Sequence, residues 1–226
     1  SKDNSKHKLL KFIEDNHVED SGIVYCLSRA RVEATAKWLT EEGFKALHYH
    51  AGMDKFHRQT NQDKFLKEEG IIMVATIAFG MGIDKPNVRF VAHLDLPKSL
   101  ESYYQETGRA GRDGLKSAAW LAYGLEDVAK ISNFIESSNA KDGQKRIERQ
   151  KLDALLGYCE TTRCRRQVLL EYFDEKLLDP CGNCDTCIEP VKCFDATVAT
   201  QKALSCVYKT EERFGASYVI DVLLGN

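Results

Sequence analysis

The chain has 226 residues, of which 43% are hydrophobic and 29% charged, so it can bury a core and form one large domain with a smaller one. Its longest nearly apolar run, residues 71–83, is shorter than the roughly 20 residues that span a bilayer. No apolar stretch at the start is typical of an export signal, and we expect no membrane partner. The net charge of −2 excludes a strongly basic domain, although a neutral protein can carry a basic groove.

Residues 21–124 alternate short β-type runs with helix-length segments. The expected strands cover residues 22–26, 45–50, 71–76, 88–94 and 118–124. The expected helices between them cover residues 31–43, 58–67 and 99–111. Strands that are apolar on both faces and separated by helices indicate a parallel sheet covered by helices. The sequence therefore predicts an α/β domain over residues 1–139.

From about residue 139 the pattern becomes helical. Residues 141–166 hold eight basic side chains against four acidic ones, with an apolar stripe that predicts a helix up to the cysteines. Further helices are expected over residues 163–173 and from Thr197 onward, before an apolar run over residues 218–225. We expect a helical metal-binding subdomain over residues 140–191 and a last domain, cut short, over residues 192–226.

Three cysteines lie at CxxCxxC spacing: Cys181, Cys184 and Cys187. Turn-forming residues between them allow three thiolates to converge on one ion. A tetrahedral ion needs a fourth ligand, and spacing alone does not choose among Cys159, Cys164 and Cys193. The pattern occurs in zinc sites and in iron–sulfur proteins, but the ferredoxin continuation to Cys-Pro is missing here. We therefore favour zinc, in a closed site with a structural role.

The most specific motif of the α/β part is QETGRAGRDG, residues 105–114, called here the glycine–arginine segment. Arg109 and Arg112 share one face if the segment is helical, and the glycines beside them allow close approach of a ligand or another backbone. Guanidinium groups match phosphate oxygens and stabilise the charge of phosphoryl transfer. The alternative is a pair of surface arginines bonded to carboxylates such as Glu106 and Asp113. For the whole segment we favour arginines that bind phosphate over this alternative.

Polar side chains and glycines also follow three of the expected strands. They are Ser28, Arg29, His50, Thr76, Gly80, Gly82 and Asp84. Ligands of α/β sheets bind where strands end, so we expect these loops and the glycine–arginine segment to open on one edge. Thr76 can reach a phosphate, and Asp84 can accept from a ribose hydroxyl or hold an arginine. For the loop that contains Asp84, the alternative is a tight connection with a surface Asp–Lys pair. For His50, the alternative is an ordinary packed or capping histidine.

These motifs resemble the RecQ family of superfamily 2 DNA helicases over nearly the whole chain. GIVYCLSR is similar to helicase motif IV, YHAGM to the block after it, VATIAFGMGIDKP to motif V and YYQETGRAGRDG to motif VI. CRRQVLLEYF followed by CGNCDTC looks like the family's zinc module. The resemblance implies a RecA-like second motor lobe, a helical zinc-binding subdomain and the start of a winged helix, of bacterial type. It makes Cys164 the fourth zinc ligand and leaves Cys159, Cys193 and Cys206 as packing thiols.

The resemblance further implies part of an ATP-dependent 3′–5′ DNA helicase that acts in DNA repair, recombination and replication. ATP with Mg²⁺ would bind between two lobes, with Arg109 and Arg112 directed at the γ-phosphate. The other residues implied at the nucleotide, or between it and DNA, are Gln105, Gly82 and Asp84. Those implied in contact with DNA are Ser28, Arg29, His50, Thr76, Arg165 and Arg166.

One departure from the family pattern bears on activity. The 226 residues contain neither a GxxxxGK[ST] phosphate loop nor a DExH box, and we expect both in a first lobe upstream of Ser1. The alternatives are an RNA helicase lobe of superfamily 2 and a non-catalytic DNA-binding adaptor. Expected partners are single-stranded DNA, duplex DNA and a single-stranded-DNA-binding protein. The expected location is the bacterial cytoplasm at the nucleoid, or the nucleus in a eukaryote.

Overall fold

The computed structural model describes residues 4–80 and 83–225. The chain divides into two compact units, Ser1–Thr161 and Thr162–Asn226. Among the described residues, no helix has both the length and the apolar character needed to cross a membrane. The domain limits expected from the sequence, at residues 139 and 191, stay predictions.

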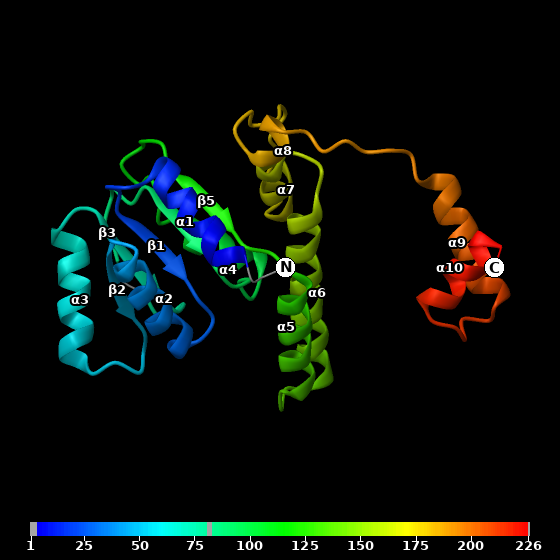
Figure 1. Cartoon of the computed structure of the whole chain (residues 1–226), viewed down its shortest axis with the longest axis horizontal. Coiled ribbons are helices and arrows are strands. Elements are labelled where there is room, and N and C mark those ends of the chain that lie inside the picture. The colour runs from blue at the N-terminus through cyan, green and yellow to red at the C-terminus, as the bar shows by residue number, and fades with distance from the viewer. Residues whose placement is uncertain (1–3, 81–82, 226) are drawn as a thin grey trace. The chain divides into compact units, whose positions relative to one another are not determined.

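The first unit contains a five-stranded parallel sheet in the order β2-β3-β1-β4-β5 (Figure 1). Its strands are β1 (Gly22–Tyr25), β2 (Lys45–Tyr49), β3 (Ile71–Ala75), β4 (Phe90–His93) and β5 (Ala118–Leu121). The three central strands are buried at every position, which is why their sequences are apolar on both faces. The predicted parallel α/β sheet is confirmed, with each strand slightly shorter than expected.

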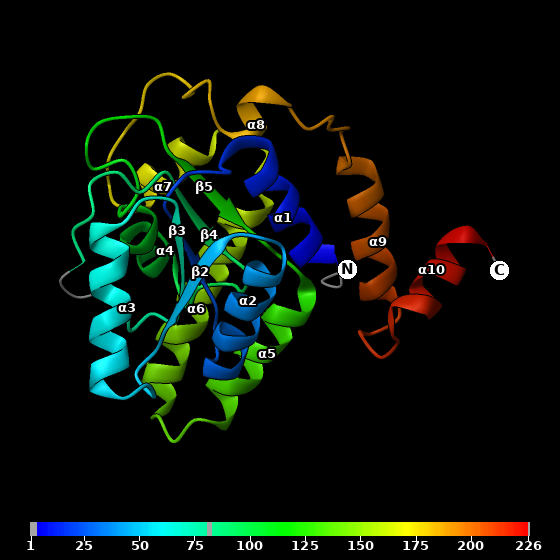
Figure 2. The same ribbon diagram turned by 60° about the vertical axis from the view of Figure 1, so that its left-hand side comes forward.

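Helices cover both faces of this sheet, and Figure 2 shows α2 and α3 on opposite sides of it. On one face lie α1 (Ser5–Asn16) and α2 (Arg29–Glu41), which bury side chains such as Leu9 and Leu39. On the other face lie α3 (Lys55–Lys67), which buries Phe65, and the connection from β3 to β4, which buries Phe79. These two cores fix the strands and therefore the loops at the strand ends.

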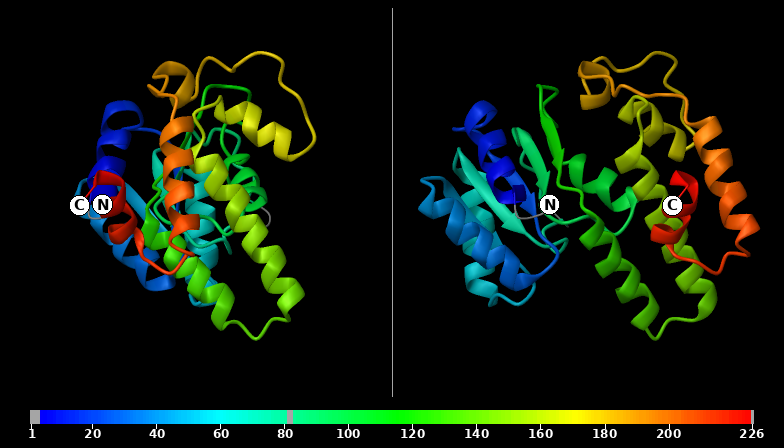
Figure 3. Two further views of the ribbon diagram at one scale, coloured as in Figure 1. Left: turned by 90° about the vertical axis from the view of Figure 1, so that its right-hand side faces the viewer. Right: turned by 45° about the vertical axis from the view of Figure 1, so that its right-hand side comes forward.

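Three further helices complete the first unit: α4 (Leu100–Thr107), α5 (Leu125–Ser137) and α6 (Asp142–Glu160). The helices α5 and α6 form an antiparallel hairpin, and α6 also packs on α4 (Figure 3). Buried Leu152, Leu155 and Tyr158 form the inner face of α6, as the expected apolar stripe requires. The helices α1 and α5 were not expected from the sequence.

The second unit contains four helices among the residues that are described. They are α7 (Arg165–Tyr172), α8 (Asp185–Ile188), α9 (Thr197–Lys209) and α10 (Ala216–Leu224). The helices α9 and α10 pack on each other and still expose large apolar side chains, such as Tyr208 and Leu224.

Gly22 in β1 lies directly opposite Phe90 in β4, and a Cβ atom at Gly22 would be 2.1 Å from the Phe90 ring. We expect Gly22→Ala to lower the free energy of unfolding by about 1–3 kcal/mol, because the overpacked ring has to move within a filled core. Gly157→Ala is the control: no atom lies within 4 Å of its Cβ position in α6, and the change should stabilise the helix by about 0.5–1 kcal/mol. Urea unfolding of the two variants gives the comparison, and an unchanged Gly22→Ala midpoint would contradict the packing argument.

Candidate functional site

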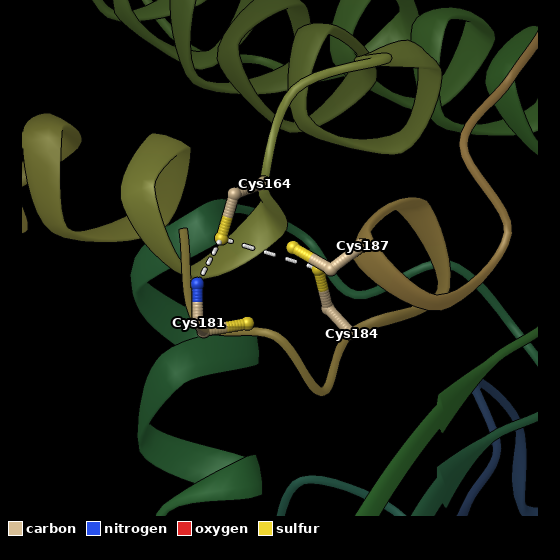
Figure 4. Close-up of side chains that lie close together, drawn as sticks. All are labelled: Cys164, Cys181, Cys184 and Cys187. Atoms are coloured by element: carbon tan, nitrogen blue, oxygen red, sulfur yellow. Dashed lines mark hydrogen bonds between the residues drawn. The ribbon is translucent and has the colours of Figure 1, made fainter. Parts of the chain in front are cut away.

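Four cysteine side chains converge in the second unit, and Figure 4 shows their sulfur atoms facing a common centre. They are Cys164, Cys181, Cys184 and Cys187, whose Sγ atoms all lie within 4.8 Å of one another. Cys164 immediately precedes α7, and Cys184 immediately precedes α8. The structure therefore brings together the CxxCxxC triple and the cysteine that the family resemblance adds to it.

Hydrogen bonds hold the loop around these thiols. The amide of Cys181 donates to Cys164 Sγ at 3.3 Å, and the Thr186 hydroxyl lies 3.2 Å from Cys184 Sγ. The same hydroxyl donates to the carbonyl of Arg163 at 2.8 Å. Thr186 thereby joins the two segments that carry the cysteines.

The thiols differ in acidity because of these contacts. For Cys184, burial opposes ionisation, but hydrogen bonding with the Thr186 hydroxyl and with the Arg165 amide lowers the pKa to about 6. For Cys187, the bond to Cys184 and burial raise the pKa to about 12. One thiolate therefore forms readily, and further ones need a cation at the centre to neutralise their mutual repulsion.

The spacing of the sulfur atoms fits one tetrahedral ion. Zinc–sulfur bonds of about 2.3 Å place four thiolates about 3.8 Å apart, close to the 4.0 Å between Cys184 Sγ and Cys164 Sγ. In an iron–sulfur cluster the thiolates bind different irons, which would hold the sulfurs farther apart. The cluster therefore fits structural zinc. Among the other thiols, Cys206 is buried as expected, whereas Cys193 is exposed and was wrongly expected to pack.

Two arginines expected at DNA lie beside the cysteine cluster. Arg165 Nε donates to Asp185 Oδ1 at 2.5 Å, and this contact lowers the pKa of the Asp185 carboxyl. The pair links α7 to α8, so Arg165 also has a structural role. Arg166 is exposed.

The glycine–arginine segment is mostly not helical, so Arg109 and Arg112 do not share a helix face. The expected helix over residues 99–111 is too long, because α4 ends at Thr107 and the chain then turns. Gly111 has φ +69° and a Cβ there would lie 2.9 Å from the carbonyl oxygen of Leu115. Only glycine fits this close backbone approach, as the segment's composition predicts.

The connection from β3 to β4 holds both arginines. A Cβ on Gly80 would lie 2.9 Å from Arg109 Nη2, so the guanidinium rests on the glycine backbone. Arg112 Nη1 donates to Asp84 Oδ1 at 2.8 Å. Asp84 therefore holds an arginine, one of the two roles expected for it, and Gly82 lies outside the described residues.

The carboxylates of the alternative interpretation have other partners. Asp113 pairs with Arg89, which lowers the pKa of the Asp113 carboxyl, and Glu106 pairs with His93 at 2.6 Å. Arg109 Nε is buried and has no hydrogen-bond partner among the described residues. A buried guanidinium nitrogen without an acceptor favours a ligand oxygen at this position. Gln105 is exposed.

The three strand-end loops meet as expected. Arg29 Nη1 lies 2.9 Å from the Cβ position of Gly52, in the loop after β2, and the Thr76 amide donates to the Tyr49 carbonyl at 3.2 Å. Ser28 caps α2, since its hydroxyl accepts from the Arg31 amide.

His50 is 4% exposed and lies in the same group of loops. Its Nδ1 accepts from the Gly52 amide at 3.2 Å, which assigns the proton to Nε2 and lets Nε2 donate to Glu33 at 2.8 Å. The structure therefore gives His50 an internal bonding role that the sequence suggested only as an alternative.

Only part of the glycine–arginine segment shares this edge, because Arg109 contacts Gly80 after β3 while the residues that follow turn away. Its amides at Gly111 and Asp113 donate to the carbonyls of Val88 and Pro86, which precede β4. The reason is that α4 leads the chain back from the end of β4 to the start of β5, as parallel strands require. Residues 111–113 thus lie toward the start of β4, whereas the Arg109 guanidinium rests on the loop that follows β3.

Comparisons with known proteins agree with this arrangement. The helicase conserved C-terminal domain matches residues 4–114, the RecQ zinc-binding family matches residues 125–188, and the RQC domain matches residues 190–226. The chain is 49% identical over 205 residues to the ATP-dependent DNA helicase RecQ of Haemophilus influenzae, covering 91% of this chain and 33% of that protein. It is 40% identical over 225 residues to the ATP-dependent DNA helicase RecQ of Bacillus subtilis, covering 100% of this chain and 38% of that protein.

A solved structure is similar to part of the chain. The E. coli DEAD-box protein SrmB, bound to the regulator of ribonuclease activity A, matches with a TM-score of 0.51 and 26% identity, over 59% of this chain and 80% of that one. The chain spans about a third of the length of the curated bacterial relatives it matches. A RecA-like helicase lobe, a four-cysteine zinc site and an RQC segment occur here in succession, and the chain belongs to the RecQ family.

Proposed function

We propose that the chain is part of an ATP-dependent 3′–5′ DNA helicase and supplies the arginines that act on the nucleotide. The observation that carries the proposal is the pair Arg109 and Arg112, held against residues 77–84 in a RecQ-family lobe. Arg109 keeps an unused donor at Nε, and Arg112 bonds to Asp84 and to the carbonyls of Gly108 and Ile83. Both can therefore donate to phosphate oxygens of ATP bound with Mg²⁺ between this lobe and a first lobe.

Single-stranded DNA is proposed to bind at the loops that follow β1, β2 and β3. Ser28, Arg29, His50 and Thr76 all lie on loops that meet there. Contacts of this kind with phosphates are independent of sequence, which suits a protein that moves along a strand. Arg165 and Arg166 are proposed to face duplex DNA, and zinc holds their segment in place.

The adaptor and the RNA helicase remain less favoured. An adaptor would leave the unpartnered Arg109 Nε without a purpose. An RNA helicase would share the lobe, but the four-cysteine module and the RQC match point to the DNA helicases of this family. The same proposal includes action in DNA repair, recombination and replication, and a single-stranded-DNA-binding protein as a partner. It places the protein in the cytoplasm at the nucleoid, or in the nucleus in a eukaryote.

The test is strand separation by the full-length protein on matched DNA and RNA duplexes with 3′ or 5′ single-stranded tails. We expect ATP-dependent unwinding of the 3′-tailed DNA duplex and at least about tenfold slower unwinding of RNA, because DNA binding is built into the zinc and RQC parts. Faster unwinding of RNA would select the RNA helicase. DNA binding without any ATP hydrolysis would select the adaptor.

A further inference from the structure

A buried polar cluster lies next to Arg109 and is not explained by the proposed nucleotide or DNA contacts. His93, the last residue of β4, is 1% exposed, and Glu106 on α4 is 7% exposed. Their side chains meet at 2.6 Å between His93 Nε2 and Glu106 Oε2. A buried ionisable pair of this kind is expensive to desolvate, so hydrophobic residues would serve stability as well or better. Its presence beside the arginine points to a role in function.

Glu106 connects this pair to Arg109 through the backbone. The Arg109 amide donates to the Glu106 carbonyl at 3.3 Å, immediately after α4 ends. The bond from the Glu106 side chain to His93 fixes the last turn of α4 against β4. The position of the Arg109 backbone is therefore set by a side chain that Arg109 itself does not need to touch.

Tyr25, the last residue of β1, holds the loop that supports the other end of Arg109. Its hydroxyl donates to the Phe79 carbonyl at 3.0 Å, next to Gly80, on which the Arg109 guanidinium rests. Its ring stacks on that of His93, with centroids 5.3 Å apart and planes at 23°. The two supports of Arg109, one through residues 79–80 at the guanidinium and one at its own backbone, thus belong to a single packed unit.

The unit extends to α6 through aromatic rings. His93 also contacts Tyr103 at 5.4 Å between centroids, and the hydroxyls of Tyr103 and Tyr158 lie 3.4 Å apart. Tyr158 is on the buried face of α6. Rings packed on both sides leave the His93–Glu106 pair little freedom to move.

We propose that Tyr25, His93 and Glu106 are positioning residues that hold Arg109 in the geometry needed for phosphoryl transfer, an inference that rests on the proposed function. None of the three contacts the nucleotide. They restrict the arginine before ATP arrives, so its donors do not have to be ordered during the reaction. Loss of this restriction lowers the rate of hydrolysis and leaves ATP binding nearly unchanged.

The test compares steady-state DNA-stimulated ATP hydrolysis by full-length variants. Glu106→Ala should lower kcat by about 10–100-fold with the KM for ATP within about twofold, because a misplaced catalytic group costs rate rather than binding. Glu106→Gln keeps an acceptor for His93 Nε2 and should recover kcat to within about threefold of the wild type. Tyr25→Phe removes one hydroxyl from a folded lobe and should lower kcat by about tenfold.

The matched control is Tyr123→Phe, which removes a hydroxyl bonded to Glu160 at the end of α6, away from Arg109. Its kcat should equal that of the wild type. Wild-type kcat in both Glu106→Ala and Tyr25→Phe would overturn the inference, as would a KM that rises in proportion to the loss of rate. If Glu106→Ala does not fold, Tyr25→Phe decides alone. A wild-type protein without DNA-stimulated hydrolysis would refute the proposed function instead.

Discussion

Arg112→Ala in the full-length protein is expected to lower DNA-stimulated ATP hydrolysis by about 10³-fold or more, the scale on which arginine fingers act. The guanidinium is 40% exposed and is held by Asp84, whose side chain is 80% exposed. An exposed ion pair contributes about 1 kcal/mol or less to stability, so the variant should fold normally. The loss would therefore report on the reaction and not on the fold.

A second exposed arginine provides the control for this experiment. Arg149 on α6 is 50% exposed and pairs with Glu136 on α5, so Arg149→Ala removes a similar surface contact without touching the nucleotide site. We expect its turnover to stay within about twofold of the wild type, since isolated surface pairs contribute little. Turnover of Arg112→Ala at the level of this control would refute a role for Arg112 at the γ-phosphate.

Cys184→Ser is expected to abolish stable zinc binding and to remove most of the soluble protein. The change takes away the thiol with the lowered pKa and leaves three ligands, while structural zinc contributes roughly 10–16 kcal/mol of binding free energy in small zinc modules. The described part of the segment around the cysteines contains only short helices, so it has little other core. Zinc content per chain, measured by atomic emission, and soluble yield give the answer.

Cys193→Ser is the matched control, because it removes an exposed thiol outside the cluster. It should keep about one zinc ion per chain and the wild-type yield. Wild-type protein that is soluble and metal-free, or a soluble Cys184→Ser variant with full zinc content, would disprove the structural role of the metal.

The sheet could be predicted because parallel strands buried on both faces have continuous apolar sequences, as Ile71–Ala75 does. The helix α1 was not predicted, since its apolar side is a short run that includes Leu9, Phe12 and Ile13 within a lysine-rich segment. The helix α4, which ends within the glycine–arginine segment, was predicted too long. Gly111 needs a positive φ, which ends helical geometry, but the sequence does not show where α4 stops before it.

The residues of the candidate site could be predicted from the sequence, but their positions in the fold only in part. The four cysteines could be named because short spacings and the family motif restrict them. The contact of His93 with Glu106 could not be predicted, because it depends on which face of β4 meets which face of α4. The return of residues 111–113 to the start of β4 follows from the direction of α4, which only the chain path determines.

The order of the strands also affects how the lobe can form during synthesis. The central strand β1 pairs with β3 and β4, and Gly22 lies opposite Ile72 and Phe90, both far along the chain. Such non-local pairing raises contact order, and it makes sheet assembly slow compared with helix formation. A nascent chain that has emerged only as far as β2 therefore exposes an apolar strand with neither neighbour, and it depends on the remaining residues, or on a chaperone, to avoid aggregation.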